Sequence, residues 1–147
     1  MSLRERLSDE MKQAMKARDE LRLSTIRLIR SAVKNRDIEL KRELNDQEIV
    51  EAIATLVKQR RESIRLFVDA GRQDLVDKEE RELTVLLEFL PQQLNREEVA
   101  ALVEKAIAES GAQGGKDMGK VMKALMPHVA GRADGKMVSD VVREKLG

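Results

Sequence analysis

The stretch DELRLSTIRLIRSAVKNRDIELKR, residues 19–42, decides the fold class of this chain. It contains neither glycine nor proline, the residues that most often interrupt helices. Its apolar residues recur with the helical period and share one broad face, which carries Leu21, Leu28, Ile29, Ala32, Val33 and Leu40. Asp19 is a typical N-cap residue. The stretch therefore predicts a long amphipathic helix from Asp19 to about Arg42.

The remainder of the first ninety residues is also poor in helix breakers, and no alternating apolar run predicts a strand. We expect three further helices there, over residues 2–17, 45–70 and 74–90. Asn45 and Glu48 have the spacing of a capping box at the start of the second of these. Gly71 is a natural stop for that helix, and Pro91 ends the one after it.

The second part of the chain combines glycine-containing loops with shorter helices. Asn95 and Glu98 repeat the capping-box spacing and begin a helix to about residue 110. Asp117 is expected to cap a helix that ends near Met126, and a last helix carries Met137, Val138, Val141, Val142 and Leu146 on its inner face. We therefore predict an all-α chain with an N-terminal bundle of about four helices over residues 1–91, a hinge near 91–95, and a small three-helix domain over 92–147.

Composition excludes several classes of protein. The 147 residues include no cysteine and one histidine, which excludes disulfides, thiolate nucleophiles and metal sites built on Cys or His clusters. The 28 basic and 27 acidic residues nearly cancel, so affinity for nucleic acid must come from local patches. The N-terminus is charged from residue 4 onward, with no apolar run of signal-peptide or membrane-span length. We expect a cytosolic protein that does not engage membranes.

Aromatic residues are nearly absent. Phe67 and Phe89 are the only two, and the chain has no Trp or Tyr. Proteins that read single-stranded bases commonly stack them on aromatic rings. If this chain binds nucleic acid, it should therefore recognise backbone and shape.

The stretch GGKDMGKVMKALM, residues 114–126, predicts an amphipathic helix with a lysine face. At the helical period, Met118, Val121, Met122, Leu125 and Met126 fall on one side, and Lys116, Lys120 and Lys123 on the other. A solvated surface has the same pattern, and the methionines are typical of core filling. The preceding glycines, however, expose backbone N–H groups at a helix start, which suit phosphate oxygens.

The next loop extends this basic region. Residues 116–136 include five basic residues and only two acidic ones, Asp117 and Asp134. The candidate nucleic-acid-binding residues are Gly114, Gly115, Lys116, Gly119, Lys120, Lys123, Arg132 and Lys136. Asp134 is read as a helix N-cap, not as a catalytic acid. His128 has no evident Ser or Cys partner for general-base catalysis.

A second basic stripe lies on the helix predicted for residues 19–42, where Arg27, Arg30, Lys34 and Lys41 share a side opposite the apolar face. Solvation alone explains such a stripe, and a clamp on a duplex backbone is the alternative. Arg60 falls on the apolar arc of its own helix, which predicts a structural ion pair. No carboxylate dyad, P-loop or dinucleotide fingerprint occurs, so we expect no catalytic residues, metal or cofactor.

Two runs, MGKVMKALM (118–126) and GRADGKMVSDVVREKL (131–146), resemble the tail domain shared by the GatB subunit of the tRNA-dependent amidotransferase and the small YqeY proteins. The pattern of that domain corresponds here to Gly119, Val121, Met122, Lys123, Gly131, Arg132, Ala133 and Asp134. The runs LRLSTIRLIRSAVKNRDIE (21–39) and KQRRESIRLFVDAGRQDLVDKEERELTVLLEFLPQQL (58–94) are similar to the N-terminal helices of YqeY itself. The resemblance to the YqeY family thus covers nearly the whole chain.

This resemblance implies a function. In GatB the tail domain helps hold the tRNA, while a separate domain, without a counterpart here, performs amide transfer. A related domain is appended to some glutaminyl-tRNA synthetases. The resemblance therefore implies a non-catalytic accessory that binds tRNA. Two alternatives stay open: a module that docks on a synthetase or an amidotransferase, and a carbon-nitrogen ligase with glutamine as amido donor, a label that would be inherited from GatB.

Overall fold

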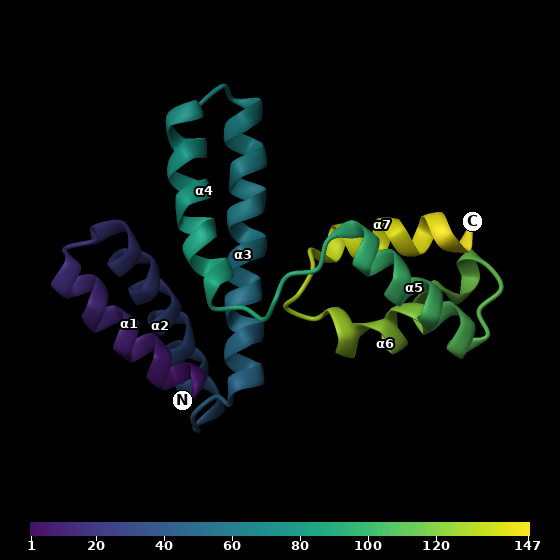
Figure 1. The fold of residues 1–147 in the computed structure, drawn as a ribbon, viewed down its shortest axis with the longest axis horizontal. Coiled ribbons are helices and arrows are strands. Elements are labelled where there is room, and N and C mark those ends of the chain that lie inside the picture. The colour runs from purple at the N-terminus through teal and green to yellow at the C-terminus, as the bar shows by residue number, and fades with distance from the viewer. The chain divides into compact units, whose positions relative to one another are not determined.

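The all-α prediction is confirmed by the structure, a computed structural model that describes residues 1–147 (Figure 1). The chain forms seven α-helices and one short 3₁₀ helix, η1, and contains no strand. Their bounds are α1 Leu3–Ala17, α2 Glu20–Leu40, α3 Asp46–Asp69, α4 Gln73–Glu88, α5 Arg96–Ser110, η1 Gly115–Asp117, α6 Met118–Val129 and α7 Gly135–Leu146.

The internal contacts of the chain divide it into two compact units, Met1–Leu90 and Pro91–Gly147. The first unit holds α1 to α4, and the second holds α5, η1, α6 and α7. Each unit has an apolar core built only from its own residues. The two units are therefore described separately.

The core of the first unit centres on α2, which packs against α1, α3 and α4. Its fully buried side chains include Ile26 and Ile29 of α2, with Ile49 and Ile53 of α3 facing the same core. Leu40, which the periodicity placed on the buried face, is 38% exposed. It is the last residue of α2, and the chain turns away from the helix axis immediately after it.

The core of the second unit lies between α5, α6 and α7, each of which contacts the other two. Valines dominate this core, with Val99 and Val103 of α5, Val121 of α6 and Val142 of α7 fully buried. Val121 and Val142 lie on the apolar faces that the sequence predicts. Packing in this unit therefore follows the helical periodicity closely.

Local capping signals set the helix starts. Asn45 and Glu48 form a complete capping box, with N–H···O distances of 2.9 and 3.1 Å, and Asn95 and Glu98 form a second one at 2.8 and 3.1 Å. Asp19 accepts the amide of Arg22 at 3.1 Å. These three predicted starts are confirmed.

The helix predicted to begin at Asp117 and to end near Met126 differs from the observed α6 in its cap hydrogen bond and in its end. Asp117 occupies the N-cap position, but its carboxylate accepts the amide of Gln113 in the preceding loop and bonds no helix amide. At the other end α6 continues through Pro127 to Val129, beyond the predicted end at Met126. A proline in the last turn removes only one helical hydrogen bond, and burial of Val129 in the core offsets that loss.

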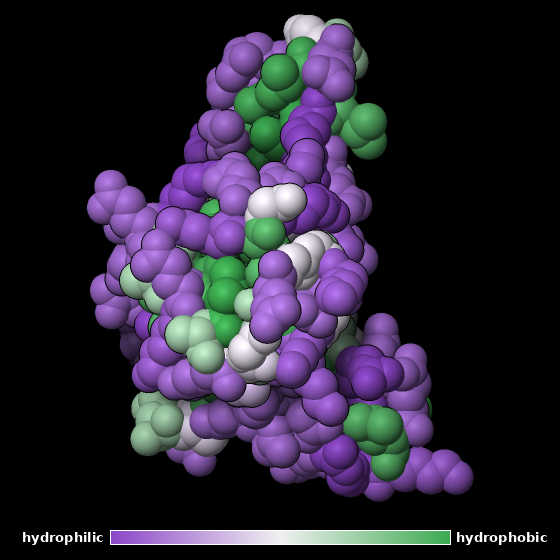
Figure 2. Space-filling model, turned by 90° about the vertical axis from the view of Figure 1, so that its right-hand side faces the viewer, coloured by the Kyte–Doolittle hydropathy of each residue, from purple (hydrophilic) through white to green (hydrophobic).

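Figure 2 shows a surface that is largely hydrophilic, with apolar side chains at the free end of the α3–α4 hairpin. Leu66 and Val68, near the end of α3, are among the exposed apolar residues. None of the helices combines the length and the apolarity that a membrane span needs.

Candidate nucleic-acid interface

The lysine face of α6 and η1, defined here as Lys116, Lys120 and Lys123, points to solvent. All three side chains are exposed, whereas Val121 and Leu125 on the other side of α6 are buried. Lys120 and Lys123 are three residues apart and lie on one side of α6, and Lys116 precedes them in η1. The predicted amphipathic division is thus present, except that Met126, expected to face inward, is 46% exposed.

The loop before this face leaves its backbone open. Gly114 has an extended conformation, and an added Cβ at Gly114, Gly115 or Gly119 would meet no atom within 4 Å. None of these three glycines has a positive φ. Neither backbone strain nor packing inside the chain therefore requires glycine there. Glycine at these positions leaves the backbone open to close approach by an external group.

Ion pairing distinguishes the lysine face from the other cations of the second unit. The paired cations there are Arg96 with Glu144, Lys105 with Glu109, Arg143 with Asp140 and Lys145 with Glu104. The lysine face and Lys136 form no ion pair. Their charge is therefore free to act on a ligand.

Arg132 has a different role from the one its charge suggested. Its guanidinium donates to the carbonyl oxygens of Gln92 and His128, both at 3.3 Å. Its own carbonyl accepts the amide of Leu94 at 2.7 Å. Arg132 therefore ties the loop between α6 and α7 to the segment that precedes α5. Sequence reasoning missed this role because the acceptors are backbone carbonyl oxygens, which no residue pattern marks.

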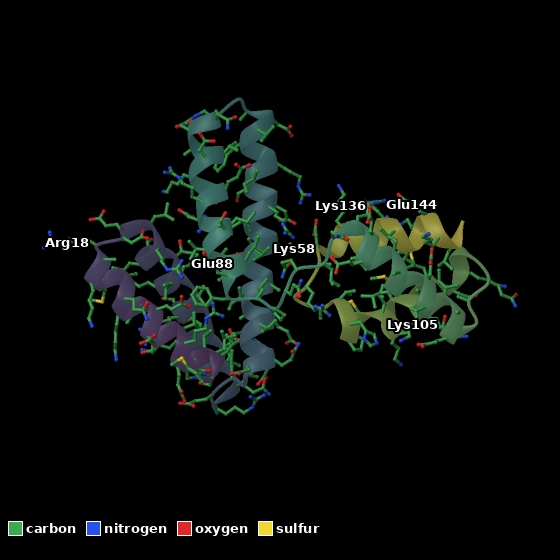
Figure 3. The ribbon with its side chains drawn as sticks, in the orientation of Figure 1. Arg18, Lys58, Glu88, Lys105, Lys136 and Glu144 are labelled. Atoms are coloured by element: carbon green, nitrogen blue, oxygen red, sulfur yellow. The ribbon has the colours of Figure 1, made fainter.

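Lys136 lies apart from the lysine face. It projects from the first turn of α7 (Figure 3), which begins six residues after the C-terminal end of α6. Lys116 precedes the opposite end of α6, and a helix of this length spans about 18 Å. The structure therefore brings Lys116, Lys120 and Lys123 together and places Lys136 at the far end of the helix.

The second basic stripe lies in the first unit, on α2. Arg27, Arg30 and Lys34 line a groove of about 940 Å³ between α1 and α2. Lys41 does not line this groove, because it follows the last residue of α2 in a left-handed conformation with φ of 55°. The stripe predicted from the helical period is thus shorter by one residue.

Arg60 forms the predicted structural ion pair. Its Nη1 lies 2.6 Å from Oε2 of Glu79 and 2.7 Å from Oε2 of Glu82. Both glutamates belong to α4, so the pair connects α3 to α4. No group of three or more Asp, Glu or His side chains lies close enough to hold a metal ion, and His128 is exposed.

Comparison with known proteins identifies the relatives of this chain. The model of the family described as Yqey-like protein matches residues 4–146. A protein of Pyrenophora tritici-repentis named Altered inheritance of mitochondria protein 41, mitochondrial, is 32% identical over 97% of this chain and 80% of its own length. Proteins of the same name are 38% identical over 70% of this chain in Kluyveromyces lactis and 36% identical over 58% of it in Lachancea thermotolerans.

These relatives correct one prediction. Each carries the word mitochondrial in its name, which contradicts the cytosolic location expected from the sequence. The charge pattern that led to that expectation concerns only apolar targeting segments, whereas mitochondrial targeting segments are amphipathic and rich in arginine. The chain spans 57% of the Kluyveromyces relative and 46% of the Lachancea relative.

Proposed function

Because this chain belongs to the YqeY family, we propose that it is a non-catalytic accessory that binds the backbone of tRNA through the lysine face. In this proposal residues 1–91 are the N-terminal bundle, and residues 92–147 correspond to the tail domain with which GatB holds tRNA. The names of the relatives describe no reaction, which is consistent with an accessory role.

The observation that carries the proposal is the unpaired state of the lysine face beside an open glycine loop. Phosphate oxygens accept both from lysine side chains and from free backbone amides at a helix start. The amides of Gly115 and Lys116 have no acceptor within the chain. An RNA backbone in this position would meet charge and amides together, and would approach glycines that carry no side chain in its way.

The absence of a base-stacking surface agrees with this mode of binding. Phe89 is buried, and Arg6 lies over its ring at 4.8 Å, so that ring cannot receive a base. Phe67 is the only other aromatic residue. Recognition in this proposal therefore depends on the shape and charge of the folded tRNA.

The test is a titration of the full chain into total tRNA and into a duplex RNA of similar charge, each at two salt concentrations. With the three lysines of the face as phosphate contacts, the slope of log affinity against log salt should be about −2. The variant Lys120→Ala/Lys123→Ala should lose most of the preferential binding to tRNA.

A matched control removes the same charge elsewhere in the second unit. Lys105→Ala/Arg143→Ala loses two cations whose exposed ion pairs contribute little to stability, so its tRNA binding should equal that of the parent chain. If the Lys120/Lys123 variant binds tRNA as well as the control does, the lysine face is not the binding site. Equal affinity for tRNA and duplex RNA would reduce the interaction to non-specific electrostatics.

A further inference from the structure

The groove between α1 and α2 has an apolar floor and a cationic wall. Leu7 and Met11 of α1 and Val33 of α2 contribute apolar surface, and Met15 of α1 adds a side chain that is 50% exposed. Arg27, Arg30 and Lys34 line the same groove from α2. This combination is unlike the lysine face of the second unit, whose α6 turns its apolar residues inward.

The charges in the groove are not balanced. Arg4 and Asp37 also line it, but they pair with one another through two hydrogen bonds of 3.0 and 3.1 Å. Arg27, Arg30 and Lys34 have no carboxylate partner, and Arg30 instead lies against Met11, with Nη1 2.8 Å from Sδ. Glu5 is the only other acidic lining residue. The groove is therefore lined by three cations without a carboxylate partner and by one unpaired carboxylate, that of Glu5.

Exposed apolar groups flank these cations. Met15 lies near the C-terminal end of α1, which the short turn joins to the start of α2. Ile38 is 65% exposed on the same side of α2 as Lys34, one turn further on. The distance along α2 from Arg27 to Ile38 is about 16 Å at 1.5 Å per residue, the length of three helical turns.

We propose that this groove is a docking site for an acidic amphipathic helix, about three turns long, of a partner protein. The apolar face of such a helix covers Met11 and Met15, whose flexible side chains adapt to different shapes. Its acidic face pairs with Arg27, Arg30 and Lys34. A nucleic-acid backbone satisfies only the cations, because phosphates and sugars leave the methionines uncovered and no aromatic side chain lines the groove to stack bases.

The test uses the full chain and a synthetic helical peptide of about 14 residues with leucines on one face and glutamates on the other. A scrambled peptide of the same composition keeps its charge but loses the apolar face. Binding is followed by fluorescence anisotropy of the labelled peptides. The amphipathic peptide should bind saturably, and the scrambled one at least about tenfold more weakly.

Two groove variants and one matched control locate the site. Arg30→Glu/Lys34→Glu reverses two exposed cations and should weaken peptide binding by about tenfold or more. Met15→Ser should weaken it several-fold by removing apolar contact. Lys58→Glu/Arg65→Glu makes the same charge change on exposed residues of α3 and should leave peptide binding intact. Circular dichroism of each variant verifies that its fold is retained.

Three results would overturn the proposal. One is the absence of saturable peptide binding up to about 1 mM. Another is an equal loss in the α3 control, which indicates non-specific charge attraction. The third is a groove variant that loses binding to duplex RNA but keeps binding to the peptide, which would assign the groove to nucleic acid. Binding of tRNA by the lysine face is a separate measurement, because the Lys120/Lys123 variant leaves the groove unchanged.

Discussion

The carboxylate of Asp37 in α2 accepts hydrogen bonds from both Nη atoms of Arg4 in α1, at 3.0 and 3.1 Å. It also accepts one from the backbone amide of Leu44, at 2.8 Å. One carboxylate thus connects α1, the end of α2 and the loop that leads to α3. The guanidinium of Arg4 is the main reason that the pKa of Asp37 lies below its usual value. This arrangement joins residues that are 33 positions apart in the sequence.

Replacing Asp37 by Ala should destabilise the first unit. The variant leaves the Arg4 guanidinium and the Leu44 amide without their shared acceptor, and partial exposure of the pair limits the cost to about 1–2 kcal/mol. Comparing the urea midpoints of the parent chain and the variant tests this loss of stability. Arg36→Ala, which breaks only an exposed pair with Glu39, is the control and should leave the midpoint nearly unchanged.

Stability should fall in acid. Arg42 donates to both carboxylate oxygens of Glu48 and lowers its pKa to about 2, with a further contribution from the amide of Asn45. Because the pKa is depressed in the folded state, the stabilisation is present above the usual glutamate pKa and is lost as pH falls through that value towards 2. The free energy of unfolding of the Glu48→Gln variant should therefore be lower than that of the parent chain at pH 7, and the two values should converge near pH 2. If the free energies of unfolding of the two chains instead change in parallel between pH 7 and pH 2, the proposed linkage is wrong.

Arg18 ends α1 with a left-handed conformation, φ of 57°, which residues other than glycine rarely adopt. Its side chain projects from the turn between α1 and α2 (Figure 3) and forms no ion pair. Arg18→Gly should raise the free energy of unfolding by about 0.5–1 kcal/mol, because relief of strain exceeds the added entropy of the unfolded chain. Arg18→Ala keeps the strain and should show no gain in the same urea titration.

Arg60 and its two glutamates predict an asymmetric response to substitution. Arg60→Gln leaves Glu79 and Glu82 close together without a cation, so we expect a loss of about 2 kcal/mol, less than for a fully buried pair. Glu82→Gln should cost under about 0.5 kcal/mol, because Oε2 of Glu82 is buried without a well-formed hydrogen bond. A larger loss for Glu82→Gln than for Arg60→Gln, in urea midpoints, would contradict this reading of the pair.

Gly119→Ala separates the stability of α6 from ligand binding. An added Cβ meets nothing within the chain, and alanine is the better helix former, so stability should rise by about 0.5 kcal/mol. If RNA approaches the backbone at this point, affinity for tRNA should fall at the same time. Gly135→Ala at the start of α7 is equally open and serves as the control, with tRNA affinity unchanged.

The helices and most of their starts could be predicted because their causes are local. Asn45 with Glu48 and Asn95 with Glu98 each specify a helix start within four residues. The apolar period alone marked Ile29 and Val33 of α2, and the same period divided α6 into a buried and a lysine-bearing side. Nothing distant in the chain is needed for these features.

Other features depended on partners that no local pattern reveals. The sequence presented Arg132 as one more cation, but its guanidinium donates to the backbone carbonyl oxygens of Gln92 and His128. The sequence predicts a helix end near Met126, just before Pro127, but α6 continues to Val129, whose side chain is buried in the core.

What the sequence by itself determined is the all-α class, the helix starts and the residues of the lysine face, since each follows from periodicity or capping over a few turns. Only the tertiary structure decided which cations remain free and which α2 residues share a groove with α1. Those outcomes depend on side chains brought together from distant positions, as Arg4 and Asp37 are, and helical periodicity carries no information about them.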